Sequence, residues 1–293
     1  MRPLLRLINN RLCKQTTKIL LIIIAVVSLG SCDKTKNDLE EGGLNGKIKS
    51  IRELSYQAFG DMDTIVRGEV VMGENINNYY ATYNLQGNQS SIINYDNLGN
   101  ELDKWVFKYS SEGEALGGNY YIDNILSDST YYTKDSKGNI LEFYHLFADG
   151  KLRYKVSYKY NRKNRITEEK VFDHENILNS VTKYTYKHGN CLEDANYDRY
   201  NRLQYFSKYV YDKKDRLIAQ QLYNSDSSLN TSGTYTYNDN NDIIKQTTSV
   251  PNVGNLTYTY TYKYDKNENW IQKITFINSS AAYITVRQIE YYE

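Results

Sequence analysis

A tyrosine pair that recurs at nearly constant spacing constrains the fold of this chain more than any other sequence feature. The pattern Tyr-x-Tyr returns every 25–27 residues, and less regular positions continue the series toward the N-terminus. The leading positions of the series are Ala81, Phe107, Tyr132, Tyr158, Tyr184, Tyr209, Tyr235 and Tyr262. Because periodicity of this length is typical of repeat architectures, we expect eight copies of one structural unit between about residues 79 and 290.

Each unit carries two turn signals, which divide it into two strands. One turn follows each tyrosine pair, as at residues 211–217, and the other lies about halfway between pairs, as at residues 95–99. Gly, Asn or Asp occupies the place where a tight turn needs a positive φ angle. Two turns in each unit leave room for strands of about 8–9 residues.

Side chains alternate in character along the expected strands, as a sheet with two different faces requires. Between residues 151 and 160, Leu152, Tyr154 and Val156 fall on one face and basic residues fall on the other. The simplest arrangement is all-β, a long antiparallel meander in which each strand pairs with its sequence neighbour. Since a sheet of more than about 10 strands must curl, split or flatten, we expect a curled or spiral sheet with tyrosines on its concave face. In this interpretation residues 48–293 form one β-repeat domain.

The first 31 residues differ in composition from the rest of the chain. A basic stretch precedes an apolar run at residues 19–29, which is too short to span a bilayer, since about 20 residues are needed. This order is typical of a secretory signal. The run ends in Leu29-Gly30-Ser31-Cys32, which resembles the bacterial lipobox, whose cysteine becomes lipidated. We predict a signal peptide over residues 1–31, lipidation at Cys32 and a flexible tether over residues 32–47; an uncleaved N-terminal membrane anchor is the alternative.

Removal of the leader changes the charge of the chain. The precursor has 36 Lys and Arg, 35 Asp and Glu, and a net charge of +1. Five basic residues and no acidic residue leave with the leader, so the mature chain has 31 basic and 35 acidic residues and a net charge of −4. This balance argues against a nucleic acid as partner.

The mature chain is expected to be an exported monomer, held by its lipid in the outer membrane of the bacterial envelope. The acidic residues after Cys32 resemble the export signals of surface lipoproteins in Bacteroidetes-type bacteria. In enterobacteria, an aspartate at this place resembles an inner-membrane retention signal instead. Periplasmic and surface exposure therefore both stay open.

Two stretches of the repeat resemble a known family. Tyr211-Asp212-Lys213-Lys214-Asp215-Arg216-Leu217 looks like the YD repeat of Rhs proteins, whose strands wind into a cocoon. The unit that begins at Tyr223 resembles repeat lipoproteins of Bacteroidetes. Departures occur at Asp215, Asn241 and Glu268, where the family pattern has Gly, and a core cleavage motif and a toxin tail are missing. The resemblance implies a YD/Rhs-like fold and an envelope location, and it brings no established activity.

Motifs of common catalytic and cofactor sites are missing from the sequence, so we expect no cofactor and no metal. His174 and His188 lie in predicted turns, where solvated residues are favoured over a metal site. The acidic turn at residues 239–242 has oxygen ligands that suit calcium, although turn chemistry alone explains them. Cys191 is interpreted as a small strand residue rather than a nucleophile.

The strongest local charge lies between residues 151 and 165. This stretch contains seven basic residues and no acidic one: Lys151, Arg153, Lys155, Lys159, Arg162, Lys163 and Arg165. Because the charges alternate with tyrosines, a solvated outer strand face is the favoured interpretation. Binding of an anionic glycan or another envelope polymer is the alternative.

These features favour a non-catalytic envelope lipoprotein whose tyrosine-rich domain serves as a binding or structural module for protein or glycan. A secreted polysaccharide-active enzyme on a curled β scaffold is one alternative, and it requires two carboxylates about 5–10 Å apart in a pocket. An Rhs-like accessory or immunity protein for a toxin is the other.

Overall fold

Nearly all of the structure is built from antiparallel β-strands. The computed structural model describes residues 36–60, 64–73 and 76–293; Cys32 and the predicted signal peptide lie outside these ranges. The elements are α2 (Asp38–Glu41), β1 (Ile48–Phe59), β2 (Val66–Val70), β3 (Asn78–Tyr83), β4 (Gln89–Tyr95), β5 (Glu101–Tyr109), β6 (Ala115–Ile122), β7 (Ile125–Lys134), β8 (Ile140–Phe147), β9 (Leu152–Tyr160), β10 (Ile166–Phe172), β11 (Leu178–Lys187), β12 (Asn190–Asp198), β13 (Leu203–Tyr211), β14 (Leu217–Asn224), β15 (Leu229–Tyr237), β16 (Ile243–Val250), β17 (Gly254–Tyr264), β18 (Trp270–Ile277) and β19 (Ser280–Tyr291). Within the described ranges, no helix is long and apolar enough to cross a bilayer.

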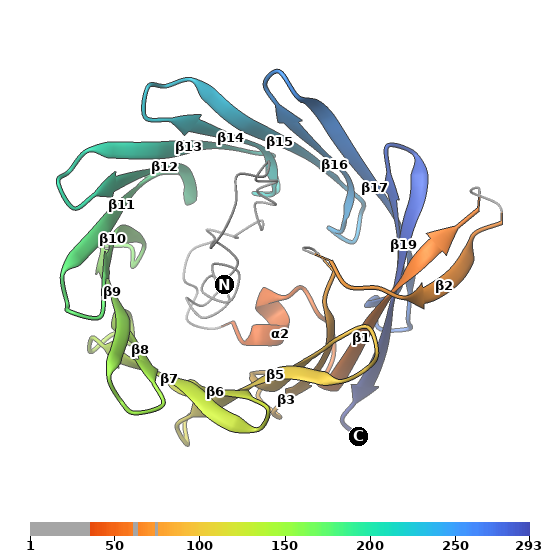
Figure 1. Cartoon of the computed structure of the whole chain (residues 1–293), viewed down its shortest axis with the longest axis horizontal. Helices are drawn as coiled ribbons and strands as arrows, with labels where there is room; N and C mark the ends of the chain where they lie inside the picture. Colours follow the sequence, from red (N-terminus) through yellow and green to blue (C-terminus); the bar gives the residue numbers. More distant parts are fainter. Residues whose placement is uncertain (1–35, 61–63, 74–75) are drawn as a thin grey trace.

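The sheet closes on itself. From β3 to β19 each strand pairs with its sequence neighbour, and β1 pairs on one side with β3 and on the other with β19. The register at the seam places Leu54 opposite Val286 and Arg52 opposite Tyr80. Eighteen strands, β1 and β3–β19, therefore form a closed antiparallel barrel, while β2 pairs with the end of β1 and projects from the ring (Figure 1).

Closure corrects the expected architecture. The strands do follow one another as a meander, but the expectation of an open curled or spiral, YD/Rhs-like sheet is wrong. An open sheet leaves two edge strands with unpaired backbone groups, and closure removes both edges. Here β1 and β19 have 12 residues each, and their backbone N–H and C=O groups pair with one another along nearly the whole length of both strands.

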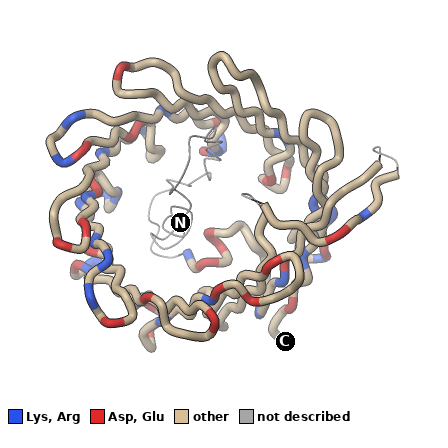
Figure 2. Tube along the Cα trace, viewed as in Figure 1, with Lys and Arg blue, Asp and Glu red and all other residues tan. Residues whose placement is uncertain are grey.

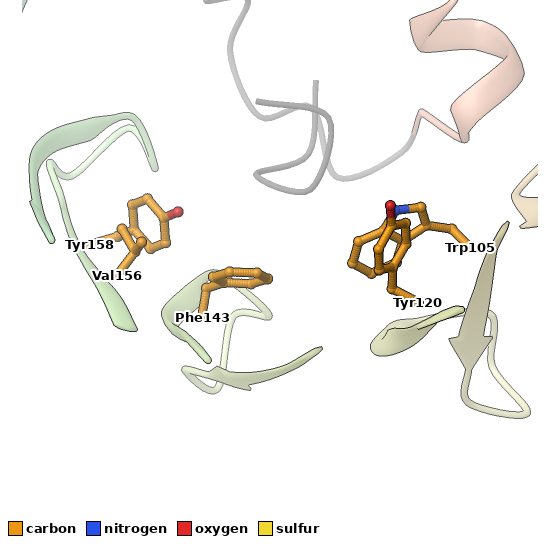
Figure 3. Packing of buried hydrophobic residues seen from close by; sticks show 5 residues of the cluster. All are labelled: Trp105, Tyr120, Phe143, Val156 and Tyr158. Carbon is orange, nitrogen blue, oxygen red and sulfur yellow. The ribbon is translucent and has the colours of Figure 1, made fainter. Parts of the chain in front are cut away.

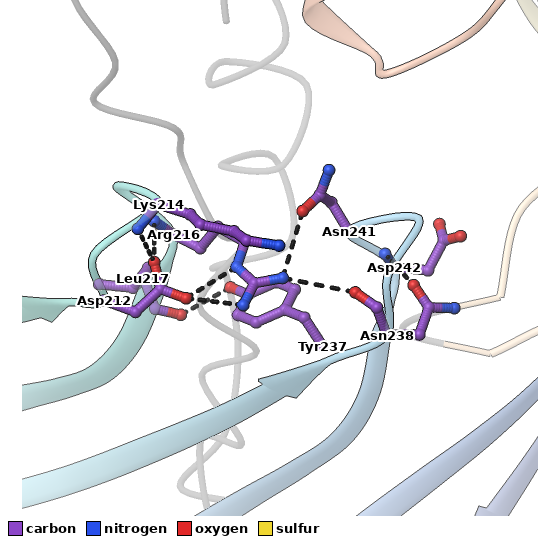
Figure 4. A network of polar contacts seen from close by, with 8 residues as sticks. All are labelled: Asp212, Lys214, Arg216, Leu217, Tyr237, Asn238, Asn241 and Asp242. Carbon is purple, nitrogen blue, oxygen red and sulfur yellow. Dashed lines mark hydrogen bonds and ion pairs between the residues drawn. The ribbon is translucent and has the colours of Figure 1, made fainter.

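Turns of one kind recur around each edge of the barrel. We call the edge with turns at residues 84–88, 110–114, 135–139, 161–165, 188–189, 212–216, 238–242 and 265–269 the N-terminal rim, and the opposite edge the far rim. In a typical turn, Asp212 Oδ1 accepts hydrogen bonds from the backbone N–H groups of Lys214 (2.8 Å) and Arg216 (2.9 Å) (Figure 4). Asp215 of the same turn has φ +60°, which explains why Asn, Asp or Gly recurs at this place.

The described part of the expected tether is docked against the barrel. A capping box at Asn37 starts α2, and Leu39 is buried at 4% exposure. The backbone N–H of Leu39 donates to Gly87 O (3.1 Å), and Asp38 accepts from the backbone N–H of Gln89 (2.7 Å). The chain from residue 36 onward is therefore fixed to the N-terminal rim, and α2 lies inside the ring (Figure 1).

Candidate binding wall inside the barrel

The closed barrel has a wide cross-section. At a strand spacing of about 4.8 Å and the usual tilt of about 40°, eighteen strands enclose a ring of roughly 35 Å diameter. Barrels of 16–18 strands are too wide for their own side chains to fill. The residues that alternate onto the inner face are therefore the natural place for a ligand.

Aromatic side chains recur along this inner wall, among polar ones. Trp105, Tyr120, Phe143, Val156 and Tyr158 point from the strands toward the centre of the ring (Figure 3) and are at most 8% exposed. Trp105 and Tyr120 pack with ring centroids 4.9 Å apart. The strand pairings place Tyr184, Tyr235 and Tyr262 on the same inner face, farther around the barrel toward the seam.

The second tyrosine of several repeats also bonds to the backbone. The hydroxyls of Tyr109, Tyr160 and Tyr237 donate to the carbonyls of Gln89, Ile140 and Leu217, each 20 residues earlier, at 2.8, 2.8 and 2.6 Å. Each bond ties the end of one strand to the start of its neighbour at the N-terminal rim. The tyrosine repeat therefore fixes strand ends as well as packing the wall.

A buried carboxylate with an arginine and a histidine as partners lies on the inner wall near the far rim. Asp128 is fully buried, and its Oδ1 lies 3.1 Å from His145 Nε2 and 2.6 Å from Arg153 Nη1. The guanidinium of Arg153 also stacks over Phe147, 5.0 Å from the ring centroid. Arg153 supplies the counter-charge of Asp128, so we interpret this cluster as structural.

A second charged cluster lies where β18, β19, β1 and β3 meet. Arg287 Nε donates to Glu53 Oε2 (2.8 Å), and the Tyr79 hydroxyl donates to the same oxygen (3.2 Å). The Arg287 guanidinium lies 3.4 Å from the centroid of the Trp270 ring. Lys273 lies on the same face, between Tyr262 on β17 and Thr285 on β19. Its Nζ is 5.1 Å from the centroid of the Trp270 ring. Burial raises the pKa of Tyr79 and lowers that of Lys273.

The seven basic residues expected to form one patch are divided among different surfaces. Arg153 turns to the inner wall, and Lys155 and Lys159 lie on the outer wall. There they pair with Glu142 (3.4 Å) and Glu168 (2.8 Å), which come from the neighbouring strands. Figure 2 shows acidic and basic residues interleaved around the ring in this way.

The remaining members of the patch lie at the two rims. Lys151 pairs with Asp149 at the far rim (2.8 Å). Arg162 and Lys163 are exposed on a turn of the N-terminal rim, where Arg165 stacks over Tyr186, 5.6 Å from the ring centroid.

The other sequence candidates occupy ordinary positions. His174 lies at the far rim, 3.9 Å from Glu175, and His188 occupies a positive-φ turn position. At the N-terminal rim, Asp242 accepts a hydrogen bond from the Tyr264 hydroxyl (2.7 Å). Cys191 is fully buried. Over the residues that the structure describes, no group of three or more His, Cys, Asp or Glu is placed to hold a metal ion.

Sequence reasoning missed the Lys273 cluster. The local pattern of β18 conceals it, because Lys273 and Thr275 alternate with the apolar Ile274 and Phe276, whereas the barrel turns Lys273 inward, opposite Tyr262 and Thr285. The partners Glu53, Tyr79 and Arg287 could not be assigned, because they depend on closure of the seam.

Comparison with known proteins gives structural resemblances and no sequence family. No protein-family model and no curated protein matches the chain. A porin-like protein from Bacteroides uniformis is 12% identical over 84% of this chain and 99% of its own, with a TM-score of 0.43. A porin-like protein from Bacteroides vulgatus is 12% identical over 84% and 98%, with a TM-score of 0.35. A Tc holotoxin pore from Photorhabdus luminescens is 11% identical over 71% of this chain and 16% of its own, with a TM-score of 0.22. The expected membership in a YD/Rhs-repeat lipoprotein family is therefore wrong: no family model matches the chain, and its strands close into a barrel instead of forming an open or spiral sheet.

Proposed function

We propose that this protein is a non-catalytic module of the bacterial envelope that binds an extended ligand, a glycan chain, along the inner wall of its barrel. The observation that carries the proposal is the polarity of the closed wall. Tyrosine and tryptophan side chains face a ring that is too wide to be filled by them, together with two local charged clusters, at Asp128 and at Glu53, while lysines such as Lys155 face outward. Aromatic side chains offer large apolar faces with a polar edge, which suits the faces and hydroxyls of sugars.

The outer wall favours a barrel that stands in water on a membrane rather than within it. Lys104, Lys155, Lys170 and Lys208 lie in the middle of β5, β9, β10 and β13 on the outward parity. A lysine on the lipid face of a membrane barrel costs about 2–4 kcal/mol at the bilayer midplane. Several such residues around one belt make a lipid-facing wall unfavourable.

The docked N-terminal segment favours one orientation of the barrel. The Asn37 side chain lies against Gly87 at the N-terminal rim. Cys32, the predicted lipidation site, precedes Lys36 by four residues, which reach about 14 Å when fully extended. A lipid at Cys32 would therefore hold the N-terminal rim close to the outer-membrane surface and leave the far rim open to the surrounding solution.

Binding is favoured over catalysis by the state of the buried acids. Asp128 is held by His145 and Arg153, and Glu53 is held by Arg287 and Tyr79. A glycosidase pair needs one carboxyl free to donate a proton and a second free to attack or activate water. Here each buried carboxylate is instead occupied by an arginine, at 2.6 Å for Asp128 and 2.8 Å for Glu53.

Two measurements test this function. Titration calorimetry of the mature chain with neutral and acidic hexasaccharides should give saturable binding, and a panel without any binding would contradict the proposal. Cell fractionation tests the placement: the wild-type chain should need detergent for extraction, and the Cys32→Ser variant should appear in the soluble fraction. A folded Cys32→Ser barrel that still needs detergent would show that the outer wall contacts lipid.

A further inference from the structure

Lys273 is a cation on the inner wall to which this part of the chain supplies no counter-ion. Its ammonium lies 5.1 Å from the Trp270 ring centroid and 6.0 Å from the Tyr260 ring centroid. Among the described residues, no carboxylate oxygen lies within ion-pair distance of it, that is, within 4.0 Å. The lysine therefore faces aromatic rings rather than an acid.

The nearest acids are already engaged by other groups. Glu53 accepts from Arg287 and Tyr79, and Asp242 accepts from Tyr264. The region therefore holds two cations, Arg287 and Lys273, and two carboxylates, Glu53 and Asp242, but the contacts of both carboxylates are made to other groups and Lys273 has no direct ion pair.

The surroundings make the lack of a direct ion pair costly for Lys273. Burial lowers the pKa of Lys273, the positive charge of Arg287 lowers it further, and the attraction of Glu53 and Asp242 does not offset the two. A dehydrated charge without a counter-ion is unfavourable, and an anion that enters the site relieves that cost. Charged groups held in this way are enriched at binding sites.

An aromatic platform lies beside the ammonium. The rings of Tyr258 and Tyr260, two residues apart on β17, are almost parallel, with an interplanar angle of 7° and centroids 6.5 Å apart. Both side chains are half-buried, so their faces are partly accessible from the interior. One side of the nearby Trp270 ring is covered by Arg287, which leaves the tyrosine strip as the surface on which a flat ligand can stack.

We propose that Lys273 and the Tyr258–Tyr260 strip form a subsite for an acidic sugar, in which a uronate carboxylate pairs with the ammonium and the sugar ring stacks on the tyrosines. This inference rests on the proposed glycan-binding function and names the substrate class. Charge and stacking surface lie side by side, which matches a carboxylate attached directly to a ring. An acidic peptide carries its carboxylates on flexible side chains and gains nothing from the ring strip.

The test compares three probes on the mature chain carrying Cys32→Ser: hexagalacturonate, the neutral hexasaccharide maltohexaose and the peptide hexaglutamate. We expect hexagalacturonate to bind most tightly. Lys273→Met should weaken it at least tenfold and leave maltohexaose binding unchanged. Lys273→Arg, which keeps the charge, should retain most of the affinity. Lys104→Met on the outer wall is the matched control and should change neither.

Stability provides a second readout for the same variant. If Lys273 is an uncompensated charge, Lys273→Met should raise the melting temperature of the ligand-free protein, and hexagalacturonate should stabilise the wild type more than the variant. A lower melting temperature with unchanged hexagalacturonate affinity overturns the inference.

The outcomes separate this inference from the proposed function. Equal binding of hexagalacturonate and maltohexaose, or equal binding of hexaglutamate and hexagalacturonate, overturns the acidic-sugar subsite while the barrel remains a binding module. Absence of binding by both saccharides overturns the subsite and the proposed function together.

Discussion

The Arg287 guanidinium donates a hydrogen bond of 2.8 Å to the Glu53 carboxylate across the seam where the last strand of the chain meets the first. The two residues are 234 positions apart in sequence and face each other in the β1–β19 register. Both side chains are largely buried, with 16% and 12% exposure. The pair is therefore a contact that exists only when the barrel is closed.

Loss of one partner at this seam should destabilise the barrel strongly. Arg287→Met leaves the Glu53 charge buried without a cation, and breaking a buried pair in this way typically costs about 3–5 kcal/mol. Urea unfolding followed by circular dichroism measures the change. The double variant Glu53→Gln with Arg287→Met removes both charges and should recover part of the loss. A single variant within about 0.5 kcal/mol of wild type would contradict closure of the seam through this pair.

The rim tyrosines should contribute through their hydroxyls. Tyr237→Phe keeps the ring and removes the bond to Leu217 O, so the free energy of unfolding should fall by about 1 kcal/mol. Tyr223→Phe is the matched control, because its hydroxyl bonds only to the Gln221 side chain on the outer wall. Equal effects of the two variants in denaturant unfolding would show that the backbone bond is unimportant.

Replacement of one turn residue, Glu268, should make the protein more stable. Glu268 holds the positive-φ position of the turn at residues 265–269 with φ +63°, where equivalent turns have glycine, as at Gly138. Glu268→Gly should raise the free energy of unfolding by up to about 1 kcal/mol, because a residue with a Cβ is strained in this conformation. Glu112→Gly, one place earlier in an equivalent turn, should give no gain. If both substitutions destabilise the protein equally, the turn geometry is wrong.

Acid should weaken the rims. The guanidinium of Arg202 and backbone N–H groups hold the pKa of Asp198 below its ordinary value, and backbone N–H groups and Arg216 do the same for Asp212. Both pKa values are lower in the folded chain than in the unfolded chain, where an aspartate has a pKa of about 3.9. The two carboxylates therefore stabilise the fold fully above about pH 3.9, and this stabilisation is lost as the pH falls below that value. The melting temperature should therefore decrease when the pH is lowered below about 4. The decrease should be less steep in the double variant in which Asp198 and Asp212 are replaced by Asn. An unchanged pH profile of the double variant would contradict this role.

Local features of the fold were predictable from the sequence, and long-range features were not. The Tyr-x-Tyr spacing and the Asn, Asp and Gly places give the strands and turns, because both depend on neighbouring residues. Closure depends on the pairing of Leu54 with Val286, and no short-range pattern encodes it. The open-sheet expectation failed for this reason.

The same limit applies to charges. The stretch at residues 151–165 contains no acid, so it reads as a basic patch in one dimension. In the sheet, Glu142 on β8 and Glu168 on β10 stand beside Lys155 and Lys159. The net charge of a β-sheet surface depends on which residues of neighbouring strands lie side by side. Residues 151–165 alone do not contain that information.

Fluorescence from single tryptophans tests the central claim, ligand binding on the inner wall, most directly. The chain has two tryptophans, Trp105 on β5 and Trp270 on β18, and both lie on the inner face. The variants Trp105→Phe and Trp270→Phe each leave one reporter, and titration with hexagalacturonate and maltohexaose follows its emission and its quenching by acrylamide. We predict a saturable emission change and reduced quenching for at least one reporter, with Trp270 responding to hexagalacturonate. Folded variants whose emission and quenching stay unchanged with both saccharides would contradict a ligand-binding inner wall.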